Sequence, residues 1–288
     1  MTAVLLLGRL PVLRVYDQPG RLTSLSVEPG RTGVERLYAH AADELDQSGT
    51  VLAVYPTWGS RTLPDQLATV RAGLETARLV PVPLELPPLG IAVLAAQLAA
   101  IAGYPVSPGR LVAGVPALAR RLVIGAWSRR ARGPAGLGSV RLGIRLLSLV
   151  PRTRFAVTVQ PTPDCVHLRG DAAPPDTWRP DSPSALVYAG RATETGWVRD
   201  IAAGNLGPER ITAAAPLPDA TRWWGSRRVV EIVACDGRPD RLVRALEATV
   251  AVRPCGWCAE PVTGDQCPFC AMTNLPRVPV LPGERSAL

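Results

Sequence analysis

Two apolar segments decide the predicted fold: Val51-Leu-Ala-Val-Tyr-Pro-Thr-Trp58 and Leu79-Val-Pro-Val-Pro-Leu84. Short apolar runs bounded by turn residues are typical of buried strands. Residues 63–77, which lie between the two runs, have the apolar spacing of a helix, and residues 89–102 form an alanine-rich helical pattern. A strand, a helix, a second strand and a second helix in this order predict an α/β fold.

The rest of the chain extends this alternation. Helices are predicted at residues 31–47, 195–203 and 239–250. Residues 221–234 fit a strand or a helix, because the period of a short apolar run does not separate the two. Strands are predicted at residues 4–7, 12–16, 22–27 and 185–188, and a hairpin at residues 155–169 with the turn Pro161-Thr-Pro-Asp164.

Composition limits the chemistry that the chain can perform. It has 288 residues, of which 47% are apolar, and a formal charge of +8. This length allows one large domain or two ordinary ones, and the apolar fraction excludes a disordered chain. All 32 basic residues are arginine. A lysine-containing phosphate loop and a Schiff-base lysine are therefore excluded. His40 and His167 are too few for a histidine-rich metal site.

Two apolar runs have some of the character of a targeting or membrane segment. Residues 3–7 are too few for the apolar part of a secretory signal, and residues 89–102 fall short of the roughly 20 apolar residues of a membrane span. We therefore expect a soluble, cytoplasmic protein. In a reducing compartment, closely paired cysteines indicate a metal site rather than disulfides.

The strongest motif is a pair of C-x-x-C spacings, Cys255-Gly-Trp-Cys258 and Cys267-Pro-Phe-Cys270. Two such turns at the ends of a short hairpin place four thiolates around one metal ion. The segment resembles a zinc ribbon and is too small for a hydrophobic core, so the metal would supply its folding energy. Four thiolates leave no open position, which predicts structural Zn²⁺, although iron in a rubredoxin-like site uses the same ligands. Cys165 and Cys235 are predicted to be ordinary buried cysteines.

Four segments, in order, resemble a reduced actin-like (ribonuclease H-like) ATPase fold, of the type found in heat-shock chaperones. Residues 4–16 are similar to the first phosphate hairpin and residues 51–98 to the strands and helices before the second lobe. Residues 155–168 are similar to the second phosphate hairpin, and residues 186–193 with 218–225 to the adenosine side. The resemblance extends to actinobacterial type VII secretion-associated proteins that carry an actin-like domain.

Both phosphate turns lack residues that ATP hydrolysis requires. Gly8-Arg9-Leu10-Pro11 lacks the usual aspartate, and Gln160-Pro-Thr-Pro-Asp164 lacks the glycines that let backbone N–H groups approach phosphates. The resemblance therefore implies a non-catalytic pseudo-ATPase that acts as a protein-interaction scaffold or adaptor, accessory to a secretion system or another multi-protein assembly. It also implies five parts: a first lobe (1–105), a basic amphipathic insertion (106–154), a second, reduced lobe (155–252), the zinc ribbon (253–273) and a disordered tail (274–288).

The positive charge is concentrated in the predicted insertion. Between Glu85 and Asp164 the chain has ten arginines and no acidic residue. A helix beginning at Pro116 would carry an apolar face opposite arginines. We expect the following arginines to bind an acidic protein partner or, peripherally, an anionic membrane: Arg121, Arg129, Arg130 and Arg132. The alternative is that the apolar face packs on the body and the arginines are only solvated.

Two other functions remain open. A zinc ribbon beside a basic segment is also typical of nucleic-acid-binding proteins, although exposed aromatic residues for base stacking are lacking here. The third interpretation is an enzyme that binds a nucleotide near Gly190 and uses Asp17 or Asp164 as an acid or base. Trp223 and Trp224, which have arginines on both sides, form either a binding patch or part of the core.

Overall fold

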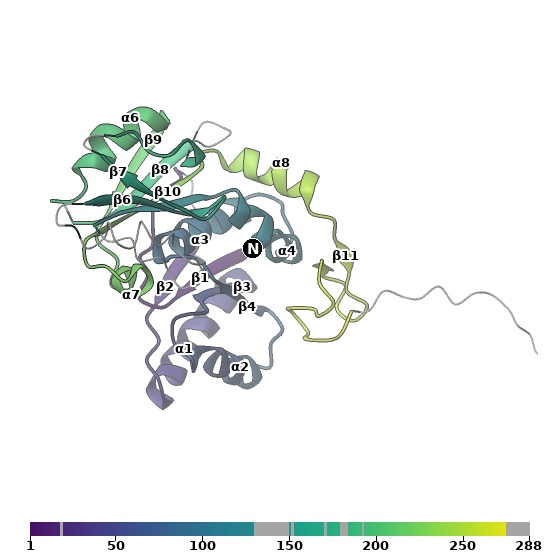
Figure 1. Ribbon diagram of the computed structural model, residues 1–288. Helices are drawn as coiled ribbons and strands as arrows, with labels where there is room; N and C mark the ends of the chain where they lie inside the picture. The colour runs from purple at the N-terminus through teal and green to yellow at the C-terminus, as the bar shows by residue number, and fades with distance from the viewer. Residues whose placement is uncertain are drawn as a thin grey trace, which may run out of the picture.

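The computed structural model describes residues 1–17, 20–129, 150, 153–169, 172–178, 184–191 and 193–274. Two β-sheets are stacked with helices between them and on both outer faces (Figure 1). The layers therefore follow the order helix, sheet, helix, sheet, helix. The predicted α/β class is confirmed.

The first sheet has the strand order β2-β1-β3-β4, and every neighbouring pair is parallel. Helices α1 (Arg31–Ser48) and α2 (Leu63–Gly73) cover its outer face. Both faces of the central strands are covered, which explains their unbroken apolar sequence. The strands are β1 (Thr2–Leu7), β2 (Leu22–Leu25), β3 (Thr50–Pro56) and β4 (Leu79–Leu84).

The middle layer is built around α3 (Pro88–Ala102), which is buried along almost its whole length. Its side chains share one hydrophobic cluster with Val4 and Leu6 of the first sheet and with Val187 and Val233 of the second. Helices α4 (Pro108–Arg120) and α8 (Pro239–Thr249) pack beside it. The buried helix predicted at residues 89–102 is therefore confirmed.

The second sheet has the order β7-β6-β5-β10-β8-β9 and is antiparallel except for the pair β8 and β9. Its outer face is covered by η1 (Asp176–Trp178), η2 (Val198–Ala202) and α6 (Ala203–Leu206). The short helix α7 (Ala220–Trp224) precedes β10, and β11 (Arg253–Pro254) pairs with β12 (Pro261–Val262). The strands are β5 (Val123–Ser128), β6 (Arg154–Gln160), β7 (Asp164–Leu168), β8 (Ser184–Ala189), β9 (Arg210–Ala214) and β10 (Val229–Asp236).

The helix predicted to begin at Pro116 is wrong. Pro116 lies inside α4, which ends at Arg120, and the chain then continues as β5. β5 is an inner strand, between β6 and β10. Its Ile124 is buried on one face of the sheet and its Trp127 on the other. Residues 108–128 therefore belong to the packed body rather than to an amphipathic surface helix.

The first hairpin of the predicted actin-like fold is also wrong. β2 runs parallel to β1, and residues 11–15 form no strand. Leu13, Val15 and Tyr16 are buried in the cluster around α3, so this apolar run supplies core contacts instead of strand pairing. The hairpin predicted at residues 155–169 is confirmed as β6 and β7.

Some predictions fall on residues that the structure does not describe. These are residues 130–149 of the predicted insertion, which include Arg130 and Arg132, and residues 275–288 of the predicted tail. In the described part of the chain, no helix is both long enough and apolar enough to cross a bilayer.

Candidate metal centre and ligand cavities

The four cysteines of the C-x-x-C pairs converge on one point. Their Sγ atoms all lie within 4.8 Å of one another, as a shared metal ion would require. The Sγ atoms of Cys255 and Cys270 are 3.7 Å apart, and those of Cys258 and Cys267 are 3.6 Å apart. A tetrahedral zinc ion with Zn–S bonds of about 2.3 Å has sulfur–sulfur edges of about 3.8 Å. The spacing therefore suits a metal ion with four thiolate ligands.

The two cysteine turns have the same backbone conformation. In the first turn, the N–H of Cys255 donates to the carbonyl of Glu260 at 2.9 Å, and the N–H of Ala259 donates to the carbonyl of Cys255 at 3.0 Å. The second turn repeats both bonds, with Cys267 donating to Met272 and Ala271 to Cys267. The alanine in each turn is left-handed, with φ of 61° and 59°. This conformation is costly for any residue except glycine, so the turns are held by the contacts around them.

The thiols of the cluster sit in unequal environments. Backbone N–H groups at Cys258 and Trp257 point at the sulfur of Cys255 and lower its pKa to about 7. Burial has the opposite effect on Cys267 and raises its pKa to about 12. Cys255 therefore ionises more readily than Cys267 in this cluster.

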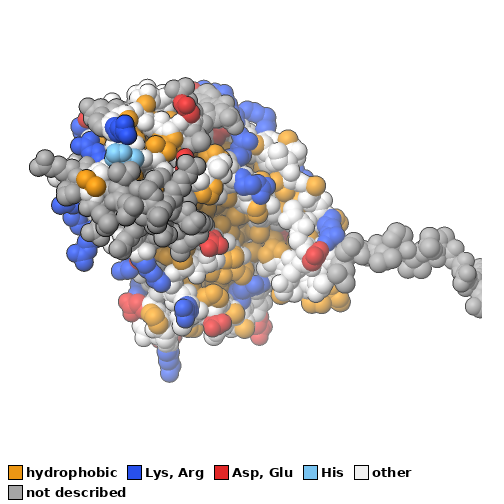
Figure 2. All heavy atoms as spheres, viewed as in Figure 1, with side chains coloured by type: hydrophobic (Ala, Val, Ile, Leu, Met, Phe, Trp, Pro, Cys, Tyr) orange, Lys and Arg blue, Asp and Glu red, His pale blue; other side chains and the backbone are white. Residues whose placement is uncertain are grey.

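The cysteine segment is fixed to the N-terminal half of the chain. Arg71 of α2 donates a hydrogen bond to a backbone carbonyl in the second cysteine turn. Arg78 forms a 2.6 Å ion pair with Glu260. At the contact with α4, a Cβ added to Gly109 would lie only 2.6 Å from the ring of Pro261. Figure 2 shows hydrophobic side chains gathered in the hollow beside this segment.

A cavity of about 490 Å³, here called the Tyr16 cavity, lies between the edge strand β2 and the segment before it. Its buried wall is apolar, and its charged side chains are exposed. The lining residues are Val12, Leu13, Arg14, Tyr16, Asp17, Gly20, Leu22 and Arg210.

The charged groups of the Tyr16 cavity are not equivalent. Arg210 is held by a 2.6 Å ion pair with Asp17, which lowers the pKa of that carboxyl. Arg14 makes no ion pair within the described part of the chain. The hydroxyl of Tyr16 donates to the carbonyl of Asp236 at 2.8 Å, and burial raises its pKa further above the ordinary value. Arg14 is therefore the cation of this cavity available to a ligand.

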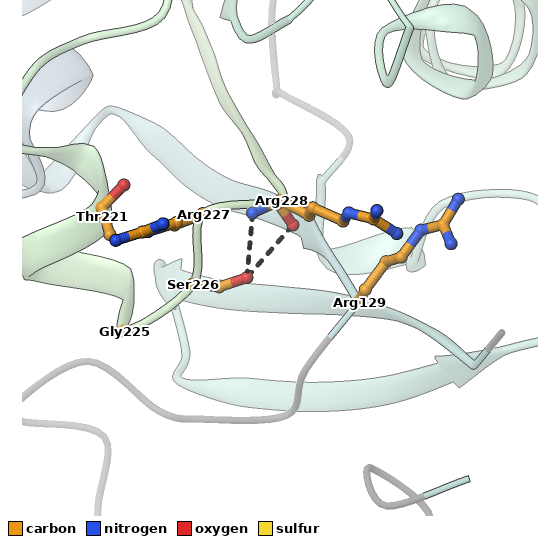
Figure 3. A pocket seen from close by; sticks show the side chains of 6 residues that line it. All are labelled: Arg129, Thr221, Gly225, Ser226, Arg227 and Arg228. Carbon is orange, nitrogen blue, oxygen red and sulfur yellow. Dashed lines mark hydrogen bonds between the residues drawn. The ribbon is translucent and has the colours of Figure 1, made fainter. Parts of the chain in front are cut away.

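A second cavity, here called the arginine pocket, has a volume of about 380 Å³. It lies where the turn after α7 meets the end of β5. The lining residues, shown in Figure 3, are Arg129, Thr221, Gly225, Ser226, Arg227 and Arg228.

Glu231 places a carboxyl group in the apolar layer between α3 and the second sheet. Its Oε1 accepts hydrogen bonds from the N–H of Leu89 at 3.3 Å and from Nε1 of Trp224 at 2.9 Å. Its Oε2 has no partner among the described residues. Burial raises the pKa of Glu231 to about 7, so this group titrates near neutral pH.

The arginines of the predicted partner surface do not share one helical face. Arg121 is exposed at the end of α4, and Arg129 follows β5 and lines the arginine pocket. Arg130 and Arg132 lie outside the described residues. The helical stripe that was predicted to align them is replaced by a strand.

Residues predicted for nucleotide chemistry have structural contacts instead. A Cβ added to Gly190 would lie 2.8 Å from Val230, so the glycine is needed for close packing on β10. Asp17 is paired with Arg210, and Asp164 accepts a 2.7 Å hydrogen bond from the N–H of Cys165. Trp223 packs against Trp58 with ring centroids 5.3 Å apart and belongs to the core.

Three residues of these sites were missed by the sequence analysis: Arg14, Arg210 and Glu231. Glu231 could have been predicted from the sequence as a buried acid, because it is a lone acidic residue inside the apolar run Val229-Val-Glu-Ile-Val233. Arg14 and Arg210 had none, since only the folded chain brings residues 14 and 210 to one cavity.

No protein-family model matches the sequence, and no curated protein matches it. Solved structures of DegV family proteins are similar in fold. One from Corynebacterium glutamicum is 13% identical, with a TM-score of 0.55, over 82% of this chain and 98% of that one. A DegV family protein from Eubacterium eligens, loaded with heptadecanoic acid, gives a TM-score of 0.52 at 11% identity, over 83% of this chain and 100% of that one. The Streptococcus pneumoniae fatty acid kinase B3 protein, loaded with linoleic acid, gives 0.51 at 11% identity over the same shares.

These likenesses assign the DegV fold to the chain and overturn the resemblance to actin-like ATPases. The scaffold function inferred from that resemblance, a pseudo-ATPase accessory to a secretion system, is wrong for the same reason. Most of the short apolar runs form strands and helices as predicted, but residues 12–16 form no strand, and β1 pairs in parallel with β2 instead of forming a hairpin. The cysteine cluster is independent of this correction, because it depends on residues 255–270 alone.

Proposed function

We propose that this protein binds a long-chain acyl lipid and that its four cysteines hold a structural zinc ion. The lipid proposal is supported at the level of fold by DegV-like structures, two of which are loaded with fatty acids. The observation that carries it in this chain is the Tyr16 cavity, which joins a buried apolar wall to exposed charge.

The Tyr16 cavity suits an amphiphile by its size and lining. Its volume of about 490 Å³ lies within the range of about 300–1,000 Å³ that is usual for small-molecule pockets. Leu13 and Leu22 would contact the acyl chain, and burying apolar surface there would supply about 25 cal/mol per Å². Arg14 would pair with the carboxylate, because Arg210 is already engaged by Asp17.

A matched pair of substitutions on β2 tests this site. Leu22 and Leu25 are both half-buried, but Leu22 lines the cavity and Leu25 packs on the α1 side of the sheet. Leu22→Trp should fill the cavity and abolish binding of palmitate, measured by displacement of a fluorescent fatty acid. Leu25→Trp should leave it unchanged. Palmitate binding that survives Leu22→Trp in a folded protein would place the lipid elsewhere.

The carboxylate contact has a test of its own. Arg14→Gln should weaken palmitate binding about tenfold, as expected for loss of a charge-assisted hydrogen bond, but should leave binding of the matching long-chain alcohol unchanged. Arg36→Gln is the control, because Arg36 is an exposed arginine on α1. Equal loss for the acid and the alcohol would assign Arg14 a structural role.

The zinc proposal is supported by the chemistry of the donor set. Four thiolates in a closed, tetrahedral arrangement are the ligands of structural zinc and leave no position for a substrate. Such an ion would join the two cysteine turns of a segment that contains only β11 and β12 as regular structure. Its role here is therefore structural.

Arg121, Arg129, Arg130 and Arg132 also remain a proposed contact for an acidic partner or an anionic membrane. Arg121 and Arg129 are the two whose positions are described, and both lie at chain turns rather than in the sheet interior. Association through exposed arginines should weaken steeply with salt, since screening acts over about 8–10 Å at physiological ionic strength.

A further inference from the structure

The arginine pocket is lined by three arginines, which lie just after β5 and just before β10 of the second sheet. Arg129 follows β5, and its N–H donates to the carbonyl of Arg228, just before β10, at 3.4 Å. Arg227 is the residue before it. Figure 3 shows the side chains of Arg129 and Arg228 extending to the same side, while that of Arg227 extends toward Thr221.

Positive charge exceeds negative charge around this pocket. Glu194 lies 3.7 Å from Nε of Arg129 and 3.9 Å from Nε of Arg228. Within the described part of the chain, it is the one carboxylate in ion-pair range of either arginine, and Arg227 has none. Arg129 and Arg228 therefore share one carboxylate, and the positive charge of the pocket is incompletely balanced.

The ion pairs in the pocket leave hydrogen-bonding groups unused. Nε of Arg129 and Oε2 of Glu194 are buried atoms, and neither has a hydrogen-bond partner among the described residues. At 3.7 Å these two atoms form an ion pair but lie too far apart for a hydrogen bond, so the Nε–H group of Arg129 still lacks a close acceptor. An oxyanion beside Arg129 would supply the missing acceptor.

The turn that carries Arg227 and Arg228 is fixed before any ligand arrives. Gly225 ends α7 in the left-handed conformation, with φ of 63°. The hydroxyl of Ser226 accepts from the N–H of Arg228 at 3.2 Å and donates to its carbonyl at 3.3 Å. Because the backbone is already ordered, binding would immobilise little beyond the arginine side chains.

From these observations we propose that the arginine pocket binds a phosphate-class oxyanion. The planar fork of a guanidinium group matches two phosphate oxygens, and two neighbouring forks match a phosphate better than an isolated carboxylate. A volume of about 380 Å³ is at the small end for ligand pockets and suits a phosphate group rather than a long chain. The site does not depend on lipid binding in the Tyr16 cavity.

Calorimetric titration of the full chain with inorganic phosphate at low salt tests the site. Arg129→Gln combined with Arg228→Gln should weaken binding at least about tenfold. The matched control combines Arg36→Gln with Arg244→Gln, which removes the same charge from exposed arginines elsewhere and should leave binding unchanged. Equal weakening in both variants would mean that net charge attracts phosphate, and the site would be rejected.

A variant that should bind phosphate more tightly keeps the test valid even if the arginine double variant does not fold. Glu194→Gln removes the competing carboxylate and keeps the shape of the side chain, so phosphate should bind several-fold more tightly. Phosphate affinity that stays the same or falls in folded Glu194→Gln protein would also overturn the proposal.

Vesicles separate the two sources of a phosphate group. If the ligand is a lipid headgroup, the chain should bind vesicles containing phosphatidic acid but not pure phosphatidylcholine vesicles, and inorganic phosphate should compete. Phosphate binding without vesicle association would assign a soluble phosphorylated ligand. Absence of both forms of binding would leave the pocket without its proposed ligand and refute the inference.

Discussion

The cysteine cluster and the Tyr16 cavity are built in opposite ways. All four cysteines of the cluster come from residues 255–270, in two turns with matching hydrogen bonds. The cavity joins residues 12–22 to Arg210, which comes from the other sheet. Chemistry that depends on local spacing is therefore visible in the sequence, whereas a cavity made by distant segments appears only in the folded chain.

The largest expected effect is loss of the metal. Changing Cys258 and Cys270 to Ser should reduce bound zinc from about one ion per chain to none, measured by elemental analysis, and should unfold residues 253–274. Structural zinc sites supply folding energy directly, so the remaining thiols should not hold the turns. Cys165→Ser is the control, because Cys165 lies on β7. A full equivalent of zinc in the double variant would contradict the site.

Glu231, like the Tyr16 cavity, depends on contacts between residues that are distant in the sequence, and it should make stability depend on pH. Its folded pKa of about 7 is above the ordinary 4.5, so between these pH values the folded chain binds more protons than the unfolded chain. Stability should therefore fall as pH rises from about 4.5 to 7 and then level off. The full difference is about 3 kcal/mol.

Glu231→Gln isolates this contribution, because the amide retains an oxygen acceptor but does not titrate. Stability measured by denaturant unfolding should differ least between the two proteins at about pH 3, well below both pKa values, where the acid is protonated in both states. Above pH 7 the variant should be the more stable. Parallel stability curves across this pH range would show that Glu231 is not the titrating group.

The smallest expected effect is the loss of stability when one of two glycines is changed to alanine. A Cβ at Gly125 of β5 would lie 2.4 Å from the ring of Trp178, whereas a Cβ at Gly256 in the first cysteine turn would meet nothing within 4 Å. Gly125→Ala should therefore cost about 1–3 kcal/mol by overpacking. Gly256→Ala should be nearly neutral. Thermal melts of both variants measure the difference, and similar melting temperatures would refute it.

The sequence predicted where helices and strands lie better than it predicted which strands pair with one another. The strand at residues 79–84 and the helix at 89–102 were correct because each has a local apolar pattern. The helix from Pro116 was not, since Leu118 lies near the end of α4 and Ile124 lies in β5, and their spacing together imitates a helical stripe. Likewise, the apolar runs of β1 and β2 do not indicate whether they pair in parallel, and that choice distinguishes the actin-like expectation from the observed sheet.

The contacts that fix the cysteine segment impose an order on synthesis. Arg71 and its acceptor are 198 residues apart, and Arg78 and Glu260 are 182 apart. As the chain leaves the ribosome from its N-terminus, the first parallel sheet and α2 are made long before these partners exist. Closure of the long loop is thus one of the last steps, and non-local contacts of this kind form slowly. A nascent chain therefore exposes the docking face of α2 until residues 253–270 emerge.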